Sequence, residues 1–402
     1  MMRRSFLKGL STVGLLSILD SVGLLGEKDG QTRDFSDPAT PSPQSAHPDQ
    51  IPSSPESGDG VVMARLKQEI LLIKRLGRVD EFRAARTVVS LARDEHIPCR
   101  LAGAGCSSIV TFLTGASDVL PTRHGLFFER FRDLNGRWAP PFVFYVEEAN
   151  RSRLVDFAQR RYARLVADGT LFFPPMPSVT AIPWMVAGSL RKEGLPDFDL
   201  GQIPLDDQNA FELLRSGDTE GIMFFHCRAS RKELQSLRPS SLADLAAISA
   251  LLQLSVDHGH LMRLYGQRVK GSQCPEAVHP AMMEVTADSW GLILFQEQVM
   301  MLLNRLGGIT VADGFDFIKA VAKRKSAIVA QYRARFLEAA RENEIGQKAS
   351  EAIFGQLQQA ASFVCCKAGC VADAMVIYRG AYLKAHYPAE FTRAVQTHLA
   401  RL

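Results

Sequence analysis

The stretch Pro140–Glu148 reads Pro-Pro-Phe-Val-Phe-Tyr-Val-Glu-Glu, and it contains the strand around which the fold is expected to form. A short apolar and aromatic run behind two prolines is typical of a buried strand. Because side chains alternate along a strand, Val143, Tyr145 and Glu147 are expected to share one face, and Glu148 to point to the other. The shared face therefore offers a single carboxylate.

Composition places the chain among folded proteins. Its 402 residues are 46% apolar, which is enough for a real core and suggests two or three domains. The net charge of +4 permits contact with nucleic acid without arguing for it. Seven cysteines, an odd number in a long chain, favour reduced thiols over a disulfide framework. No apolar run reaches the ~18 residues of a membrane-spanning helix, so no membrane span is expected.

The N-terminus carries two segments that differ from the rest. Residues 1–28 begin with Arg3 and Arg4 before an apolar run that Asp20 interrupts, which resembles a twin-arginine export signal. A non-native extension or a wrongly assigned start is the alternative. Residues 29–60 alternate proline with Ser, Asp and Gln and are expected to form a disordered linker, because they cannot bury enough apolar surface.

The first folded elements lead to a turn of small residues. Apolar periodicity predicts helices at Val61–Leu76 and about Val79–Glu95, followed by a short strand at Ile97–Leu101. The turn Ala102–Ser108 then opens a helix at Ser107 or Ser108. A glycine turn before a helix N-terminus can cradle phosphate, and a plain helix N-cap is the alternative.

The rest of the chain is expected to be mostly helical. An arginine-rich helix at Ala149–Leu165 presents either a solvated face or contacts to a nucleic-acid backbone. Ala167–Gly201, with four prolines between Pro174 and Pro183, is expected to be irregular. Gly221–Phe225 is expected to form a strand. Further amphipathic helices are expected, marked by Phe295, Val299, Leu302 and Leu306, and by Val371, Met375, Tyr378 and Tyr382.

Several stretches occur in the order seen in one known family. The longest are Phe295–Met300 (Phe-Gln-Glu-Gln-Val-Met) and Ala381–Phe391 (Ala-Tyr-Leu-Lys-Ala-His-Tyr-Pro-Ala-Glu-Phe), and shorter ones lie at Gly125–Phe131 and Ile203–Asp207. Together they resemble the bacterial C-family replicative DNA polymerase, the DNA polymerase III alpha subunit. The resemblance covers about residues 62–162 and 203–397.

This resemblance implies a fold and a division into domains. The fold class is α+β, predominantly helical, with a truncated nucleotidyltransferase-type palm followed by a helical fingers-like domain. The expected boundaries are a palm-like domain at 61–162, an irregular bridge at 163–202 replacing the thumb and the rest of the palm, and a fingers-like domain at 203–402.

The resemblance also implies templated DNA synthesis with two magnesium ions held by aspartates, but those aspartates are replaced. Without gaps, the family's metal-binding positions fall on Val143 and Tyr145. Two-metal catalysis needs several carboxylates converging on ions ~3.5–4 Å apart. Glu147, Asp197 and Asp199 are weak substitutes, and the last two are better explained as linker residues. We therefore expect no catalytic residue, no bound metal and no cofactor, with Mg²⁺ required only if the protein is active.

The residues that contact nucleotides in the family are partly kept. In the Gly-Arg-Gly-Ser turn of the family, Ala102 and Ala104 replace the arginine and the serine, whereas Gly103 and Ser108 remain. A basic set is retained and is expected to bind nucleic acid or to form a solvated surface: Lys319, Lys323, Arg324, Lys325 and Lys367. By contrast, Cys365, Cys366 and Cys370 lack the second short-spaced pair that a structural zinc site commonly has.

Three hypotheses follow for function. The first is a degenerate, non-catalytic relative of the polymerase with weak residual binding to DNA. The second is an active DNA polymerase of replication or repair that uses Glu147, Asp197 or Asp199. The third is an exported non-catalytic binding protein. The resemblance implies a cytoplasmic location, the leader allows export, and no segment resembles the family's phosphoesterase domain, hairpin domain or sliding-clamp motif.

Overall fold

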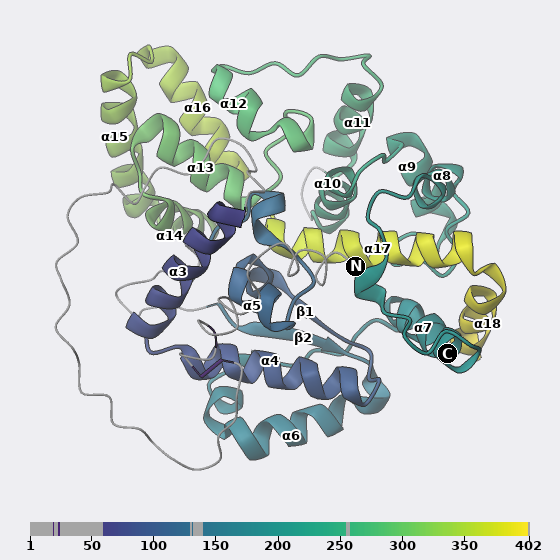
Figure 1. Ribbon diagram of the computed structural model, residues 1–402. Coiled ribbons are helices and arrows are strands. Elements are labelled where there is room, and N and C mark those ends of the chain that lie inside the picture. Colours follow the sequence, from purple (N-terminus) through teal and green to yellow (C-terminus); the bar gives the residue numbers. More distant parts are fainter. Residues whose placement is uncertain are drawn as a thin grey trace, which may run out of the picture.

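One of the two cores of the molecule contains a three-stranded sheet packed against helices (Figure 1). The computed structural model describes Leu19 and residues 23–24, 59–128, 131, 140–254 and 258–400. Of the expected leader, only Leu19 and residues 23–24 are described, and of the expected linker only its last two residues; the rest of both segments lies outside the described residues. The prediction of an α+β, predominantly helical chain is confirmed.

The sheet contains the expected central strand. The strands are β1 (Cys99–Ala102), β2 (Phe142–Val146) and β3 (Leu171–Phe172), in the order β1-β2-β3. β2 pairs antiparallel with β1 and parallel with β3. Side chains alternate along β2 as predicted: Phe142, Phe144 and Val146 are fully buried, while Val143 and Tyr145 are only partly buried.

An aromatic cluster covers the buried face of the sheet. Phe82 of α4 (Val79–Asp94) meets Phe142 edge-on, with ring centroids 5.1 Å apart, and Phe131 lies 5.9 Å from Phe142. On the same face, Phe144 stacks on Phe173 at 5.3 Å. α4 also packs on α6 (Glu148–Ala167), so these two helices close this side of the molecule (Figure 1).

Two helices beside the sheet follow the predicted periodicity. α3 (Asp59–Arg75) buries its predicted apolar stripe, and α5 (Ile109–Thr114) follows the small-residue turn, which forms the 3₁₀ segment η1 (Gly103–Ser107). A second 3₁₀ segment, η2 (Pro121–His124), comes next. The remaining helices are α7 (Ile182–Lys192), α8 (Gln208–Ser216), α9 (Arg228–Leu237), α10 (Leu242–Gln253), α11 (His258–Val269), α12 (Pro280–Val285), α13 (Gln296–Gly307), α14 (Val311–Ala322), α15 (Ser326–Glu342), α16 (Gln347–Ala360), α17 (Lys367–His386) and α18 (Pro388–Leu399).

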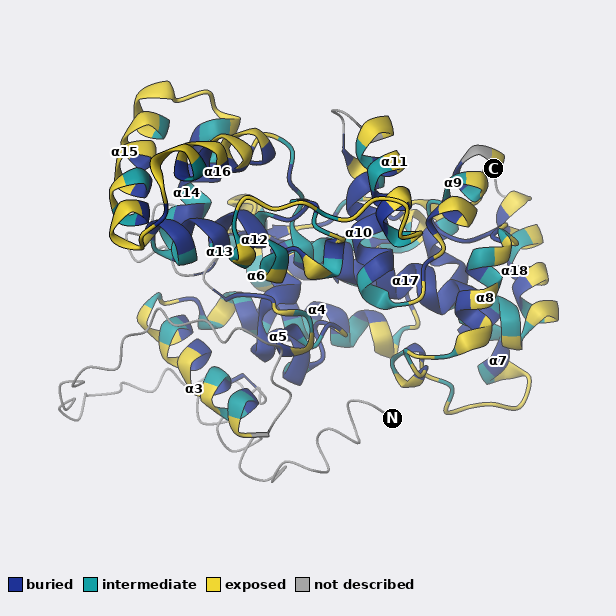
Figure 2. Cartoon of the chain, turned by 90° about the horizontal axis from the view of Figure 1, so that it is seen from above, coloured by how far each residue is buried: buried dark blue, intermediate teal, exposed yellow. Residues whose placement is uncertain are grey.

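α17 joins the helical part to the sheet. It packs against α10, α8 and η1, and its residues are buried on nearly every side (Figure 2). A helix that is apolar all round belongs in the interior of a protein. A second core, separate from the one that includes the sheet, is formed mainly by α12 to α16. Within the described residues, no helix has the length and apolar character needed to cross a bilayer.

Two local predictions are wrong. The stretch predicted to be irregular contains β3 and the helix α7, in which Pro183 occupies the first turn, a position where its missing N–H costs nothing. Gly221–Phe225 is a turn and not a strand, because Gly221 and Phe224 have φ values of +80° and +67° that interrupt an extended chain. Its apolar side chains are nevertheless buried, with Ile222 and Phe225 at 1% and 0% exposure.

Candidate functional site

The face of the sheet opposite the aromatic cluster is where the resemblance places metal-binding aspartates. The strand register pairs Arg100 with Tyr145, and Val143 with both Ala102 and Phe172. Paired residues point to the same side of a sheet. This face therefore presents apolar and aromatic groups and one cation, and Phe172 is 55% exposed.

A guanidinium group is fixed against the ring of Tyr145. The Arg100 Cζ atom lies 5.0 Å from the ring centroid, and Nη2 donates to Oδ1 of Asp373 in α17 at 2.6 Å. The Arg100 and Asp373 side chains are only 10% and 12% exposed. Within the described chain, Nε and Nη1 of Arg100 have no hydrogen-bond partner. The aromatic face and one carboxylate therefore hold this buried positive charge.

Asp373 is itself tied into a polar network that reaches α10. Its Oδ2 accepts from Gln253 Nε2 at 3.2 Å and from Ser249 Oγ at 3.4 Å. The carboxylate thus has partners on both oxygens, one from the sheet and two from α10. The network connects β1, α10 and α17, and both carboxylate oxygens of Asp373 accept hydrogen bonds from other side chains of the protein.

The three acids considered as substitute metal ligands lie at a helix N-terminus and in an exposed turn. Glu147 occupies the N-cap position of α6 and accepts from Asn150 Nδ2 at 2.9 Å. Asp199 accepts from the Gly201 N–H at 2.9 Å, which is a local turn interaction, and Asp197 is exposed two residues earlier. In the residues that the structure describes, no group of three or more His, Cys, Asp or Glu side chains is arranged to hold a metal ion.

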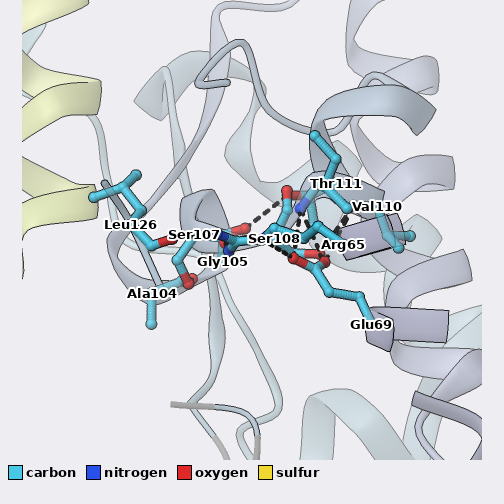
Figure 3. Close-up of polar contacts among 10 residues, drawn as sticks. Arg65, Glu69, Ala104, Gly105, Ser107, Ser108, Val110, Thr111 and Leu126 are labelled. Atoms are coloured by element: carbon cyan, nitrogen blue, oxygen red, sulfur yellow. Dashed lines mark hydrogen bonds and ion pairs between the residues drawn. The ribbon is translucent and has the colours of Figure 1, made fainter. Parts of the chain in front are cut away.

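At the small-residue turn, an internal carboxylate takes the backbone N–H groups (Figure 3). Glu69 of α3, 1% exposed, accepts from Ser108 Oγ at 2.6 Å, from the Ile109 N–H at 2.9 Å and from the Val110 N–H at 3.4 Å. The Ser108 side chain also accepts from the Val110 N–H as the N-cap of α5, which confirms the N-cap interpretation. The donors that open this helix are therefore satisfied from within the protein.

Arg65 completes this arrangement one turn earlier on α3. Its Nε donates to Glu69 Oε1 at 2.8 Å, and its two Nη groups donate to the carbonyl oxygens of Ser107 and Leu126. The pKa of the Glu69 carboxyl is raised, because burial outweighs the lowering effects of Arg65 and of the hydrogen bonds from Ser108 and Ile109. The ion pair binds α3, η1 and the chain at Leu126 together. Gly103 begins η1 with φ at +66°.

The five predicted basic residues divide into two groups. Lys367 Nζ pairs with Asp288 at 2.5 Å and is 14% exposed at its side chain, and Lys319 Nζ pairs with Asp316 at 2.7 Å. The other three form the exposed turn between α14 and α15, and none has an ion pair within the described chain: Lys323, Arg324 and Lys325. We call this segment the basic turn. The predicted role of all five, and of Gly103 and Ser108, stays a prediction.

The arginine-rich helix α6 likewise contains both ion-paired arginines and further exposed ones. Arg151 pairs with Glu148 at 3.2 Å, and Arg153 pairs with Glu95 at 2.7 Å. Arg160, Arg161 and Arg164 are exposed near the helical break at Tyr162. They provide a second basic surface against which the basic turn can be compared.

Sequence reasoning missed the three residues that organise the site. Glu69 stands in the apolar stripe of α3, three residues after Leu66, where an acid must find a partner when buried. Arg100 and Asp373 likewise interrupt apolar stretches. These positions signalled buried charges, but nothing in the pattern identified their partners.

Comparisons with known proteins match this chain in two adjoining blocks. Residues 47–176 match the bacterial DNA polymerase III alpha NTPase domain, and residues 178–344 match the bacterial DNA polymerase III alpha subunit finger domain. The boundary lies between β3 and α7, inside the stretch expected to bridge two domains.

Individual relatives show partial coverage. The DNA polymerase III subunit alpha of Pasteurella multocida is 31% identical over 228 residues, covering 55% of this chain and 20% of the relative. That of Escherichia coli K12 is 30% identical over 263 residues (63% and 22%), and that of Aquifex aeolicus is 31% identical over 195 residues (48% and 17%). The matched part of this chain spans about a fifth of the length of these relatives.

Proposed function

Over the two matched blocks this chain is a bacterial DNA polymerase III alpha-like protein. On that premise we propose that it does not join nucleotides but retains weak, salt-dependent binding of nucleic acid. One observation carries the first half of this proposal. The Arg100 guanidinium lies over the ring of Tyr145, at a position that the resemblance gives to a metal-binding aspartate.

The electrostatics of that position oppose metal binding. Magnesium requires oxygen ligands in near-octahedral geometry, usually including carboxylates. Here the nearest fixed charge is positive, and the carboxylate that balances it, Asp373, already accepts from Arg100, Ser249 and Gln253. A divalent cation would have to displace a buried guanidinium, and Val143 and Tyr145 offer it no anionic oxygen.

The second half of the proposal rests on the basic turn. Its three cations are exposed and adjacent, so they can approach phosphates without breaking an ion pair in the described chain. Each phosphate neutralised releases counterions, which makes such binding weaken as salt rises. Lys319 and Lys367 are engaged with Asp316 and Asp288, so we assign them a smaller contribution.

The binding test compares two basic surfaces that differ in position but not in charge. We expect primed DNA, followed by fluorescence anisotropy at several salt concentrations, to bind the full chain with a salt dependence. The triple variant K323A/R324A/K325A should reduce the slope of log affinity against log salt by about 2–3, since each of the three lost phosphate contacts removes ~0.7–0.9. The α6 variant R160A/R161A/R164A should change it little. Equal losses in both variants, or no salt-dependent binding at all, would contradict the assignment.

Catalysis is tested separately by primer extension. We expect no extension of a primed template with Mg²⁺ or Mn²⁺ and labelled nucleotides. Extension that is abolished by Glu147→Ala would support the alternative of an active polymerase with substituted ligands, and would overturn the first half of the proposal.

A further inference from the structure

Two cysteines meet at the beginning of α17. Cys366 is the N-cap residue of this helix, so Cys365 occupies the position before the cap and Cys370 the fourth helical position. Side chains at these two positions commonly pack against each other across the first turn of a helix. The spacing of five residues therefore places the two side chains on the same side of the first turn.

The two sulfur atoms share one environment against α10. Cys365 Sγ lies 3.9 Å from the Ala250 carbonyl oxygen, and Cys370 Sγ lies 4.0 Å from Gln253 Nε2, three residues along the same helix. Each thiol also shifts the pKa of the other. Cys370 is buried at 2% exposure and Cys365 is partly exposed, so a small solute reaches Cys365 first.

The interaction between the two thiols shifts their pKa values in opposite directions. The Cys370 side chain lowers the pKa of Cys365, whereas the Cys365 side chain and burial raise the pKa of Cys370. By contrast, burial raises the pKa of Cys99 and Cys106 to about 12, which makes them poor nucleophiles. Cys227 and Cys274 are exposed.

We propose that Cys365 and Cys370 form an oxidisable dithiol, a modification site whose oxidant is a peroxide. In the first step the Cys365 thiolate attacks one peroxide oxygen of hydrogen peroxide, the O–O bond breaks, and Cys365 becomes a sulfenic acid with release of hydroxide. In the second step the Cys370 sulfur attacks the sulfenic sulfur, and the hydroxyl group leaves as water after taking up a proton. The sum is two thiols and one peroxide giving one disulfide and two waters.

The disulfide would replace a packing contact with a covalent bond at a junction of three elements. The N–H of Lys367, the first residue of α17, donates to Glu297 of α13 at 2.9 Å, and the Lys367 ammonium pairs with Asp288. Cys365 continues this junction, because its N–H donates to the Leu294 carbonyl at 2.9 Å. Oxidation would therefore tie the first turn of α17 to the segment that contacts α10 and α13.

Peptide mapping can read out this bond without any activity. Trypsin cleaves after Lys367, between the two cysteines, and yields peptides 349–367 and 368–379. The folded full chain would be treated with a small excess of hydrogen peroxide, alkylated in denaturant to block exchange, digested and analysed by mass spectrometry. We expect these two peptides to be joined, with the mass of their sum less two hydrogens, and to separate on reduction with dithiothreitol.

Matched variants identify the sulfur atoms, since Cys366 is in the same peptide as Cys365. Cys365→Ser and Cys370→Ser should each abolish the joined species, whereas Cys366→Ser should leave its yield unchanged. Oxidation in urea should spread the disulfides over other cysteines, which shows that the pairing depends on the fold. The proposal is overturned if Cys366→Ser removes the joined species, if Cys227 or Cys274 supplies the main disulfide, or if Cys365 accumulates as sulfinic acid without linkage.

Discussion

Two turns of this molecule, both expected to meet phosphate, use their polar groups in opposite ways. At η1 and the start of α5, the backbone donors and the Ser108 hydroxyl point inward to Glu69, which Arg65 neutralises. At the basic turn, the three cations point to solvent. The comparison teaches that a polar group kept in the sequence is not thereby free to bind a ligand, because the fold can satisfy it from within. Any binding that remains should come from groups the fold has left unsatisfied, so the basic turn is the better candidate.

The strongest test of the inward-facing turn removes its carboxylate. Glu69→Ala would leave the partly buried Arg65 without its counter-charge and remove the buried acceptor of three donors. We expect a loss of about 3–5 kcal/mol in the free energy of unfolding, as for other broken buried ion pairs. Denaturant unfolding measures this loss. On the neighbouring helix, Asp80→Ala removes an exposed partner of Arg83 and should cost less than about 1 kcal/mol. Equal effects would mean that the carboxylate at the turn is not important.

The next test addresses the face of the sheet opposite the aromatic cluster, where Arg100 forms a buried ion pair with Asp373. Arg100→Ala and Asp373→Ala should each cost about 2–4 kcal/mol, because each strands a buried charge. The double variant should cost less than the sum, with a coupling free energy of about 1–3 kcal/mol measured by a double-mutant cycle. Additive costs would show that the two side chains act independently.

A smaller effect is expected from the segment that follows α5. The pKa of His124, at the end of η2, is lowered from 6.5 to about 4 by burial and by the nearby charges of Lys367 and Arg123. The unfolded chain therefore binds more protons than the folded one between these values, so stability falls as pH drops from about 6.5 towards 4. Thermal unfolding of His124→Asn should lose fewer degrees over this range than the unsubstituted protein. Identical pH profiles would assign the acid sensitivity to other groups.

The smallest effect is expected at the basic turn itself. Removing the three exposed cations in K323A/R324A/K325A should change the free energy of unfolding by no more than about 0.5 kcal/mol, which denaturant unfolding can establish. The same variant should carry the largest loss in DNA binding. A large loss of stability would show that these side chains serve the fold, and would remove the contrast between the two turns.

Local pattern predicted much of the fold and little of the site. The alternation in Pro140–Glu148 identified β2 and its two faces, because a strand has a period of two wherever one side is buried. Pro183 was misread as a sign of irregular chain, although a proline fits the first turn of a helix. The buried polar contacts escaped prediction for another reason: the hydrogen-bonded Glu69 and Ser108 are 39 residues apart, and the ion-paired Arg100 and Asp373 are 273 apart. Periodicity reports which residues are buried, and only the tertiary fold determines which of them meet.

The guanidinium over Tyr145 also bears on how such a protein can evolve. Restoring an aspartate at position 145 would place a new carboxylate beside Arg100, its register partner, where it would be neutralised before any ion could use it. Removing Arg100 first would leave Asp373 without its counter-charge in the interior. Each of these single substitutions is therefore expected to be either silent or damaging, and a metal-binding pair at this face would need several coordinated changes.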